Sequence, residues 1–504
     1  MNTLVLDIES YYDAHTSVGR GKMTYVEYSR APDFELFGAS VKWNNEEPKW
    51  LRPGPLFKYL QELPANYTLV GHNLPFDGCC LGESGFPLKA HRYFCTRAAA
   101  QAIYNSSITS ASLNALAKQF LKDEKTPGVL DSVKGKHWCD MTSLEQKAME
   151  IYCNHDVYLT DLLYKLFEPQ LPAEEQLTLH HTQRMYLEPL LIVDQDILHQ
   201  TIADAVSRRD QLIEKAGEIL KTDGKKTLTL LSGDTFSKRL AKYTEIPMKP
   251  SPSVEGRFIP ALAKADLEMQ ALVKSSVPEI RTLCEARLNV KSNILKTRAE
   301  RFLRDDVPYS RFYLNYAGAI ATLRDSGGQR SNKQNLPRGS TLRASIQAPK
   351  GYKLMVIDSS NIELRTMFYI AGQEDKLTLI RAGEDQYSHS AADTIYHIPV
   401  EDITKKQRAV GKVQMLSLQY GASWKKMKYI FAAGLMGPPV DLTDAEAEAI
   451  WNNYRAHNRK VKNFWFLCDG FLHDMAQGII KTYNIPGTTA PLYTTEKDKP
   501  VSYT

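Results

Sequence analysis

The sequence predicts two folded parts: an α/β or α+β domain that ends near residue 170, and a larger, mainly helical part that contains a further buried strand. Three observations support this division. Strand-like and helix-like stretches alternate up to residue 167, two prolines bracket a short join at residues 168–172, and a helical, charged pattern runs from about 174 to 305. At roughly 150 residues per domain, a chain of 504 residues has room for about three domains.

The composition is that of a globular protein and excludes collagen-like, mucin-like and disordered classes. Hydrophobic residues make up 43% of the chain and charged residues 24%, and no uncharged apolar run reaches the roughly 18 residues of a membrane span. The N-terminus lacks the basic and apolar regions of a signal peptide, and the seven cysteines form no Cys-x-x-Cys pair. We therefore expect a cytoplasmic protein with reduced thiols and no membrane partner.

Charge is distributed unevenly along the chain. Residues 1–170 carry 17 Lys and Arg against 20 Asp and Glu, whereas the remainder carries 46 against 38. A basic surplus in the second part favours an acidic partner such as a nucleic-acid backbone. Ordinary surface charge explains the surplus equally well, because the net charge of +5 is modest for a chain of this length.

The individual elements follow from local patterns. Residues 4–9, 37–43 and 67–71 are strand-like, and residues 111–121 and 144–167 are helix-like. In the second part, residues 352–358 should form a buried strand that ends in a carboxylate and leads into an amphipathic helix over 361–371. Residues 322–340 should form a loop, residues 408–420 another helix, and Thr443 with Glu446 a helix start.

Four acids in the first part form the first candidate site. Asp7 and Glu9 are two residues apart on a strand, so both side chains point to one face. Asp77 follows a strand, and Asp156 comes four residues after Tyr152 on one face of a helix. Four carboxylates together can hold two divalent cations, which activate a water and stabilise the leaving oxygen of a phosphodiester. Any one of these acids alone is more simply a surface or capping residue.

Jointly, Asp-x-Glu, Asn-x-x-Phe-Asp and Tyr-x-x-x-Asp in this order resemble the three exonuclease motifs of the DEDDy proofreading 3′–5′ exonucleases. The resemblance implies an α/β ribonuclease-H-like exonuclease domain over residues 1–172. It implies that Asp7, Glu9, Asp77 and Asp156 are the ligands of two Mg²⁺ ions, with Mn²⁺ as a substitute. It also implies that Tyr152 orients the attacking water.

The second candidate site begins at Asp358, where the predicted strand ends in Asp-Ser-Ser-Asn-Ile-Glu-Leu-Arg. A carboxylate there can hold Mg²⁺ against a triphosphate, and the main-chain carbonyl of Ser359 can complete the ligand set. Further on, one helical face carries residues at four-residue intervals, ahead of a glycine: Arg408, Lys412, Leu416, Tyr420 and Gly421. Two cations one turn apart suit a triphosphate, although a solvated basic face is the simpler explanation of such a helix alone.

Together these segments are similar to motifs A and B of the family A DNA polymerases, the latter being Arg-x-x-x-Lys-x-x-x-aromatic-x-x-x-Tyr-Gly. Leu416 departs from motif B, where the family has an aromatic residue. A third segment, with Arg324 and then Gln334-Asn335-Leu336-Pro337, resembles the region ahead of motif A that contacts the minor groove of primer–template DNA. Leu323 replaces a glycine of that region. By resemblance, Glu363 excludes a ribose 2′-OH and pairs with Tyr420.

The resemblance implies an α+β right-hand polymerase domain over residues 173–504, with the thumb at about 200–310, the palm at about 311–366 and the fingers at about 367–455. The palm of this family needs a second carboxylate, in a His-Asp-Glu strand–turn–strand. The one His-Asp pair after motif B is His473-Asp474, where apolar residues recur at helical spacing, so we predict a helix there. The palm is therefore predicted to be incomplete.

Three interpretations remain open. In the first, which we favour, the chain belongs to a split polymerase, and a second polypeptide supplies the missing carboxylate for joining dNTPs to a primer–template. In the second, the chain is a 3′–5′ exonuclease whose degenerate palm is a DNA-binding clamp. In the third, the polymerase-like part recruits a replisome or processivity factor. A clamp needs phosphate contacts but neither a metal carboxylate nor a sugar gate. The order of the two parts resembles phage-type members, which implies the host cytoplasm.

Overall fold

The computed structural model describes residues 2–19, 22–232, 235–251, 253–264, 266–319, 322–435, 437, 439–479, 481–487 and 492–493. The chain divides into two compact units. The first comprises Met1–Gly217 and Asn289–Leu354, and the second comprises Glu218–Leu288 and Met355–Thr504. Among the described residues, no helix is long and apolar enough to cross a membrane.

A five-stranded mixed sheet organises the first unit, in the order β3-β2-β1-β4-β5. The central strand β1 pairs with β2 in antiparallel register and with β4 in parallel register. All three predicted strands are present. The strands are β1 (Asn2–Ser10), β2 (Leu36–Trp43), β3 (Lys49–Leu51), β4 (Tyr67–Gly71) and β5 (Arg92–Cys95).

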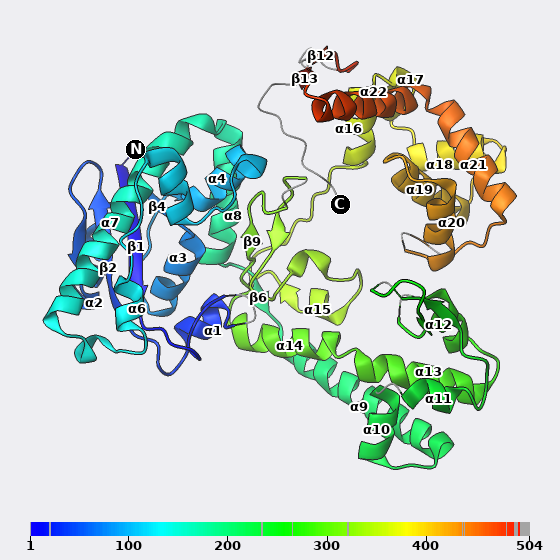
Figure 1. Cartoon of the computed structure of the whole chain (residues 1–504), viewed down its shortest axis with the longest axis horizontal. Helices are drawn as coiled ribbons and strands as arrows, with labels where there is room; N and C mark the ends of the chain where they lie inside the picture. The colour runs from blue at the N-terminus through cyan, green and yellow to red at the C-terminus, as the bar shows by residue number, and fades with distance from the viewer. Residues whose placement is uncertain are drawn as a thin grey trace. The chain divides into compact units, whose positions relative to one another are not determined.

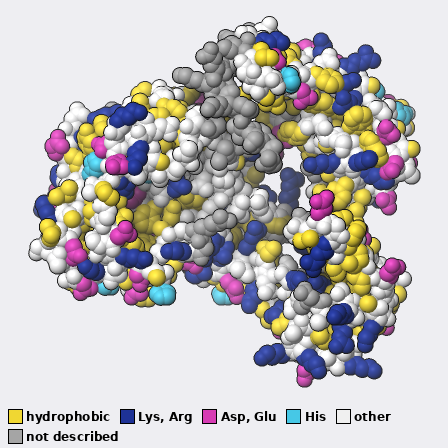
Figure 2. All heavy atoms as spheres, in the orientation of Figure 1, with side chains coloured by type: hydrophobic (Ala, Val, Ile, Leu, Met, Phe, Trp, Pro, Cys, Tyr) yellow, Lys and Arg dark blue, Asp and Glu magenta, His cyan; other side chains and the backbone are white. Residues whose placement is uncertain are grey.

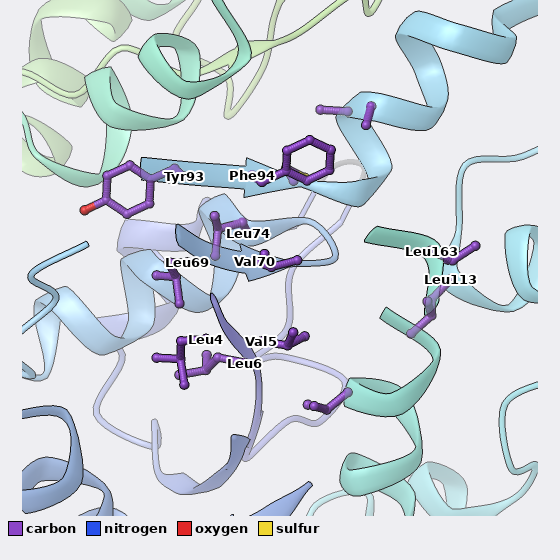
Figure 3. Packing of buried hydrophobic residues seen from close by; sticks show 14 of the residues in the cluster. Leu4, Val5, Leu6, Leu69, Val70, Leu74, Tyr93, Phe94, Leu113 and Leu163 are labelled. Carbon is purple, nitrogen blue, oxygen red and sulfur yellow. The ribbon is translucent and has the colours of Figure 1, made fainter. Parts of the chain in front are cut away.

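The long helix α7 (Ser143–Phe167) lies against β1 and β2 (Figure 1). It begins at Thr142, whose side chain accepts from Glu145 N while the Glu145 carboxylate accepts from Thr142 N, so both ends of a capping box are made. Leu163 of this helix and Leu113 belong to the same buried cluster as the apolar side chains of the strands (Figure 3). The predicted helix over 144–167 is confirmed, and its buried face carries Tyr152 and Asp156.

Shorter elements complete the first unit. The predicted helix over 111–121 is a short α-helix that continues as a π-helical turn. The helices are α1 (Tyr25–Ser29), α2 (Pro53–Glu62), α3 (Leu74–Glu83), α4 (Thr96–Tyr104), α5 (Leu113–Leu116), α6 (Val129–Val133), α8 (Ala173–Leu187), α9 (Gln195–Leu220), α14 (Ile294–Asp305) and α15 (Thr341–Ala344). The short strands are β6 (Ile192–Val193), β9 (Leu314–Asn315), β10 (Ser326–Gly327) and β11 (Ile346–Gln347), and the turns are η1 (Asn105–Ser107), η2 (Ala117–Leu121), η3 (Trp138–Asp140), η4 (Glu168–Gln170) and η5 (Lys333–Asn335).

The second unit is mainly helical, and its largest core includes the buried residues Leu364, Phe368, Val413, Leu418 and Phe431. The predicted helix starts at residue 361 and at Thr443 are both confirmed. The helices are α10 (Gly224–Ser232), α11 (Thr235–Leu240), α12 (Leu267–Val273), α13 (Pro278–Lys291), α16 (Ile362–Ala371), α17 (Glu374–Arg381), α18 (Gln386–Ala391), α19 (Lys405–Leu418), α20 (Trp424–Ala433), α21 (Asp444–His457) and α22 (Arg459–Ala476). The strands are β7 (Met248–Pro250), β8 (Phe258–Pro260), β12 (Thr482–Tyr483) and β13 (Leu492–Tyr493), and the turns are η6 (Ala392–Tyr396) and η7 (Val400–Asp402).

The prediction of a buried strand at residues 352–358 was wrong. The segment has no strand pairing within the described residues, and its apolar side chains face solvent: Met355 is 78% exposed and Ile357 is 85% exposed. An apolar run becomes a strand when neighbouring strands satisfy its backbone groups and cover its faces. No described segment does either here, so the run stays unpaired.

Candidate functional site

The four acids of the first candidate site come together at one end of the central strands. Asp7 and Glu9 project from β1 on the same face, and a ligand atom of each lies within 4.8 Å of the other and of the Cys153 sulfur. Asp77 is 2% exposed, and its Oδ1 accepts a hydrogen bond of 3.3 Å from the backbone N–H of Ile8. That bond fixes Asp77 beside the strand.

Helix α3 carries Asp77 to this place because the chain turns sharply after β4. Asn73 takes a left-handed conformation, with φ at 65°, and caps the helix. Asparagine tolerates this conformation better than most residues with a side chain. Pro75, in the first turn, has a fixed φ that suits a helix start. Asp77 therefore falls within the first turn, directly behind the strand end.

Burial and mutual repulsion perturb the acids strongly. Burial, followed by the charge of Asp156, raises the pKa of Asp7 to about 7. Burial and the neighbouring carboxylates also raise the pKa values of Glu9 and Asp77 well above their usual range. Carboxylates crowded in this way are stabilised by a proton or by a cation. A cluster with several raised pKa values is a frequent sign of a functional site.

The residues fit a divalent cation. Asp77 Oδ2 and Asp156 Oδ1 are buried and have no hydrogen-bond partner in the described part of the chain. Orphaned buried carboxylate oxygens are costly, and a hard cation satisfies them. The donor set, with carboxylate oxygens from Asp7, Glu9, Asp77 and Asp156, matches the ligands that Mg²⁺ and Mn²⁺ prefer.

Two further residues of this site have no counterpart in the sequence argument. The Lys125 ammonium forms an ion pair with Asp156 and lies 4.8 Å from the centroid of the Tyr152 ring. The Cys153 thiol donates to Asp7 Oδ2 over 3.6 Å. Cys153 directly follows Tyr152, so its helix position could have suggested its place. Lys125 lies in a loop 31 residues before Asp156, and no spacing rule connects the two.

The second candidate site is spread over an extended segment and two helices of the second unit. Asp358 and Ser359 are exposed in the segment that precedes α16. Glu363 lies in the first turn of α16, where its Oε2 accepts a hydrogen bond of 3.3 Å from the side-chain amide of Gln419. Gln419 is the C-cap of α19, so this bond ties the start of one helix to the end of the other.

Helix α19 carries the predicted phosphate-binding pair, as the four-residue spacing requires. Arg408 makes a two-pronged contact with Asp385, in which Nε and Nη2 each donate over 2.8 Å. Although burial opposes it, this pairing holds the pKa of Asp385 below its usual value. Lys412 follows one turn later and is half-buried, as is Leu416. Asp385, which caps the neighbouring helix α18, was not predicted from the sequence.

Tyr420 and Gly421 follow directly after α19. Tyr420 is 64% exposed, and Gly421 has a φ of 76°, a conformation that favours glycine. The predicted helix thus ends at Leu418, two residues earlier than expected. The chain turns at this point and resumes as α20.

Arg324, Gln334 and Asn335 belong to the first unit, unlike the rest of the second candidate site. Gln334 and Asn335 are exposed on a 3₁₀ turn, where they are accessible to a ligand. Leu323 has a φ of 53°, the left-handed region that glycine adopts easily. Leu323 therefore departs from the family pattern in its side chain but has a backbone conformation that is typical of glycine.

The prediction that His473 and Asp474 lie on a helix is confirmed. Both belong to α22, and Asp474 accepts a hydrogen bond from the Tyr483 hydroxyl and pairs with Lys481 at 3.5 Å. These contacts lower the pKa of Asp474, with the Tyr483 bond as the largest cause. Asp474 thus lies on a helix and bonds to Tyr483 of β12, and it is not part of a strand–turn–strand.

A basic surface that the sequence argument did not single out lies over α10 and α11. Figure 2 shows Lys and Arg side chains gathered on these helices, in the lower right of the view. Its exposed members are Lys221, Lys225, Lys226, Lys238, Arg239 and Lys242. Their density within 22 residues of sequence was the available signal.

Comparison with known proteins identifies the family of the two parts of the chain. Residues 33–172 match the family model described as 3′-5′ exonuclease, and residues 324–482 match that of DNA polymerase family A. The chain belongs to the family A DNA polymerases that carry a 3′–5′ exonuclease domain.

Its relatives include bacterial and phage enzymes. The chain is 24% identical to DNA polymerase I of Pseudomonas aeruginosa, in a match that covers 70% of this chain and 39% of that protein. It is 22% identical to the DNA polymerase of Bacillus phage SP02, over 92% of this chain and 76% of that protein.

The fold is similar to that of a solved structure, the POL domain of Pol1 from M. smegmatis in complex with DNA primer-template and dNTP. The match has a TM-score of 0.59 and 17% identity, and covers 96% of this chain and 76% of that chain.

Proposed function

We propose that the chain is a DNA-templated DNA polymerase chain that also removes nucleotides from DNA 3′ ends. The observation that carries the nuclease half is the convergence of Asp7, Glu9, Asp77 and Asp156 beside Tyr152. Within the described chain, Asp77 and Asp156 each keep one buried carboxylate oxygen without a hydrogen-bond partner. The observation that supports the polymerase half is the match of residues 324–482 to family A. We expect it to act in the cytoplasm on primer–template DNA.

In the nuclease site, the four acids would hold two Mg²⁺ ions, which supply an activated water and stabilise the leaving 3′ oxygen. The chain's own contribution is to hold the acids rigidly and to orient the water. Burial, followed by the charge of Asp156, raises the pKa of Tyr152, so its phenol stays protonated at neutral pH. Tyr152 therefore orients the water by hydrogen bonding and does not take its proton.

In the polymerase site, Asp358 and the Ser359 carbonyl would hold Mg²⁺ against an incoming dNTP. Lys412 and Arg408 would neutralise the triphosphate as charge develops on the leaving group. For this, Arg408 must exchange its contact with Asp385 for phosphate oxygens, which its planar guanidinium binds in the same two-pronged way. Glu363 would exclude a ribose 2′-OH, and Tyr420 and Gly421 would flank the templating pair, next to Leu416.

DNA would be gripped along its backbone and minor groove. Arg324, Gln334 and Asn335 would contact the primer–template minor groove. The exposed basic surface over α10 and α11 would add phosphate contacts that carry no sequence information. Binding should therefore weaken steeply with salt, because each neutralised phosphate releases counterions.

The exposed, mainly apolar segment at residues 352–357 favours the interpretation that a second polypeptide completes the palm. A continuous apolar run is typical of a strand covered on both faces, yet this one is exposed and unpaired in the described chain. A partner that adds strands on either side would bury it and place a second carboxylate near Asp358. The alternative is an exonuclease whose polymerase-like part only holds DNA, and the same exposure does not exclude it.

Two experiments test these halves separately. Asp7→Ala with Glu9→Ala should abolish 3′-end degradation and leave duplex binding intact. Glu46→Ala with Glu47→Ala, two exposed acids between β2 and β3 of the same domain, should leave degradation unchanged. Persistent degradation by the first double variant would refute the nuclease assignment.

For synthesis, the lone chain would be given primer–template, dNTPs and Mg²⁺, with and without a candidate partner. Robust synthesis by the lone chain contradicts the split palm, and no synthesis with any partner favours the clamp.

A further inference from the structure

Lys125 places a fixed positive charge inside the nuclease site. Its ammonium pairs with the Asp156 carboxylate, which is 2% exposed, and lies 4.8 Å from the centroid of the Tyr152 ring. The lysine side chain itself is 27% exposed. A cation over an aromatic face attracts the ring, and a cation beside a buried carboxylate offsets its burial. One side chain therefore restrains two residues of the proposed site.

The loop that carries Lys125 is anchored at Lys125 itself and just before it. The Lys125 backbone N–H donates to Asn114 Oδ1 over 3.1 Å. Asp123, two residues earlier, pairs with His155 of α7 at 3.5 Å. Lys122 turns the chain with a φ of 60°. These contacts hold the loop against the helix that bears Asp156, so the lysine is built into the site and does not merely reach it from a mobile surface.

The charges of the site explain what such a lysine would do. Its ammonium is bonded to Asp156 Oδ2, and its charge also acts on Asp7, Glu9 and Asp77. Asp156 Oδ1 has no hydrogen-bond partner among the described residues. A single ammonium offsets one of four negative charges, so it stabilises the site without a bound ion. The same ammonium repels a divalent cation that approaches the other oxygen, because Coulomb repulsion is strong in a partly desolvated site.

We propose that Lys125 is a positioning residue of the nuclease site, whose ammonium is a built-in cation on Asp156 that holds Asp156 and Tyr152 in place and competes with divalent cations. This inference rests on the proposed nuclease function. The proposal predicts that cation binding and hydrolysis change in opposite directions when the ammonium is lost. A lysine with a purely structural role would not produce this pattern. Loss of the ammonium should strengthen cation binding, because one positive charge is gone, and should slow hydrolysis, because Asp156 and Tyr152 lose a restraint.

The test compares three variants of the full chain. Lys125→Met removes the charge and keeps the length of the side chain, and Lys125→Arg keeps the charge. Lys118→Met is the matched control, because Lys118 pairs with the exposed Glu124 in the same loop region. The measurements are the melting temperature in EDTA, the dissociation constant for Mn²⁺ by titration, and single-turnover degradation of a 5′-labelled oligonucleotide at saturating Mn²⁺.

We expect Lys125→Met to melt lower than Lys118→Met in EDTA, and to regain most of the difference with Mn²⁺. Its Mn²⁺ dissociation constant should fall about threefold or more, and its cleavage rate should fall about tenfold, with little change in DNA affinity. Lys125→Arg should stay near the wild type in its Mn²⁺ dissociation constant and in its cleavage rate. Weaker or unchanged Mn²⁺ binding by Lys125→Met would overturn the inference. If that variant does not fold, Lys125→Gln takes its place.

Failure of the inference differs from failure of the proposed function. If the wild-type chain degrades 3′ ends with Mn²⁺ while Lys125→Met behaves like Lys118→Met, the nuclease assignment stands and the role of Lys125 is refuted. If the wild-type chain neither binds Mn²⁺ nor degrades DNA, the proposed nuclease function fails, and the role of Lys125 fails with it.

Discussion

Arg311 and Glu83 form an ion pair of 2.6 Å in which the guanidinium is 14% exposed and the carboxylate 12% exposed. Glu83 is the last residue of α3, the helix that carries Asp77 in its first turn. Arg311 also donates to the carbonyl of Tyr186 over 2.8 Å. The nuclease helix is thus fastened to a segment more than 200 residues further along the chain, which explains why the first unit contains residues from both sequence halves.

Loss of this ion pair should destabilise the first unit. Arg311→Met leaves Glu83 poorly exposed and short of one partner, so we expect a loss of about 2–3 kcal/mol in the free energy of unfolding. Arg30→Met is the matched control, because Arg30 pairs with the same carboxylate at 2.7 Å but is 38% exposed, and it should cost about 1 kcal/mol or less. Denaturant titration measures both. Equal losses of unfolding free energy in the two variants would contradict the claim that the more buried ion pair contributes more to stability.

The stability of the metal-free chain should depend on pH through Asp7. Its pKa in the folded chain is about 7, against an ordinary value of 3.8, so the folded state binds the proton more tightly than the unfolded state does. Stability from this group is therefore greatest below about pH 4 and falls as the pH rises to about 7. Asp7→Asn cannot ionise, and it should gain about 1 kcal/mol or more on the wild type between pH 5 and pH 8.

That comparison is made in EDTA by denaturant titration at the two pH values. Asp161→Asn serves as the control, because Asp161 lies on α7 outside the cluster and is already paired with Lys165 at 2.8 Å. A difference between Asp7→Asn and the wild type that does not change with pH would show that Asp7 ionises normally in the folded chain. Mn²⁺ should reverse the advantage of Asp7→Asn at pH 8, because the ion needs the ionised carboxylate.

The backbone at Leu323 predicts a stabilising substitution. A leucine at a φ of 53° costs roughly 1 kcal/mol relative to glycine, and the side chain is 52% exposed, so little packing is lost on its removal. Leu323→Gly should therefore raise the melting temperature slightly, whereas Leu323→Ala, which keeps a Cβ, should not. A lower melting temperature for the glycine variant than for the alanine variant would be the opposite of this expectation.

Lys412 provides a direct test of the proposed triphosphate contact. Lys412→Met removes the ammonium from the middle of α19 and should weaken dNTP binding to a chain–primer–template complex about tenfold or more. Lys406→Met is the control, because Lys406 is exposed in the first turn of the same helix and has no proposed role. Nucleotide-dependent protection against thermal unfolding measures the affinity without requiring synthesis. Equal affinities for the two variants would remove Lys412 from the site.

The sequence was most informative where a local pattern and a site coincide. The strand with Asp7 and Glu9 and the helix with Asp156 have strong periodicity, so their element type and the faces of their acids followed directly. Lys125, Arg311 and Asp385 could not be found in this way, because each meets its partner through tertiary packing that no spacing encodes. The prediction for residues 352–358 was wrong because an apolar run indicates that a segment tends to be buried. It does not indicate which element would cover that segment.

The most direct test of the central claim is the polarity and cation dependence of DNA degradation. A 5′-labelled primer with a mispaired 3′ end would be incubated with the chain, with Mg²⁺ or EDTA, and compared with the same chain carrying Asp77→Asn. We predict stepwise shortening from the 3′ end with Mg²⁺, none in EDTA, and at least a hundredfold slower shortening by Asp77→Asn. Internal cuts, release from the 5′ end, or full activity of Asp77→Asn would contradict it.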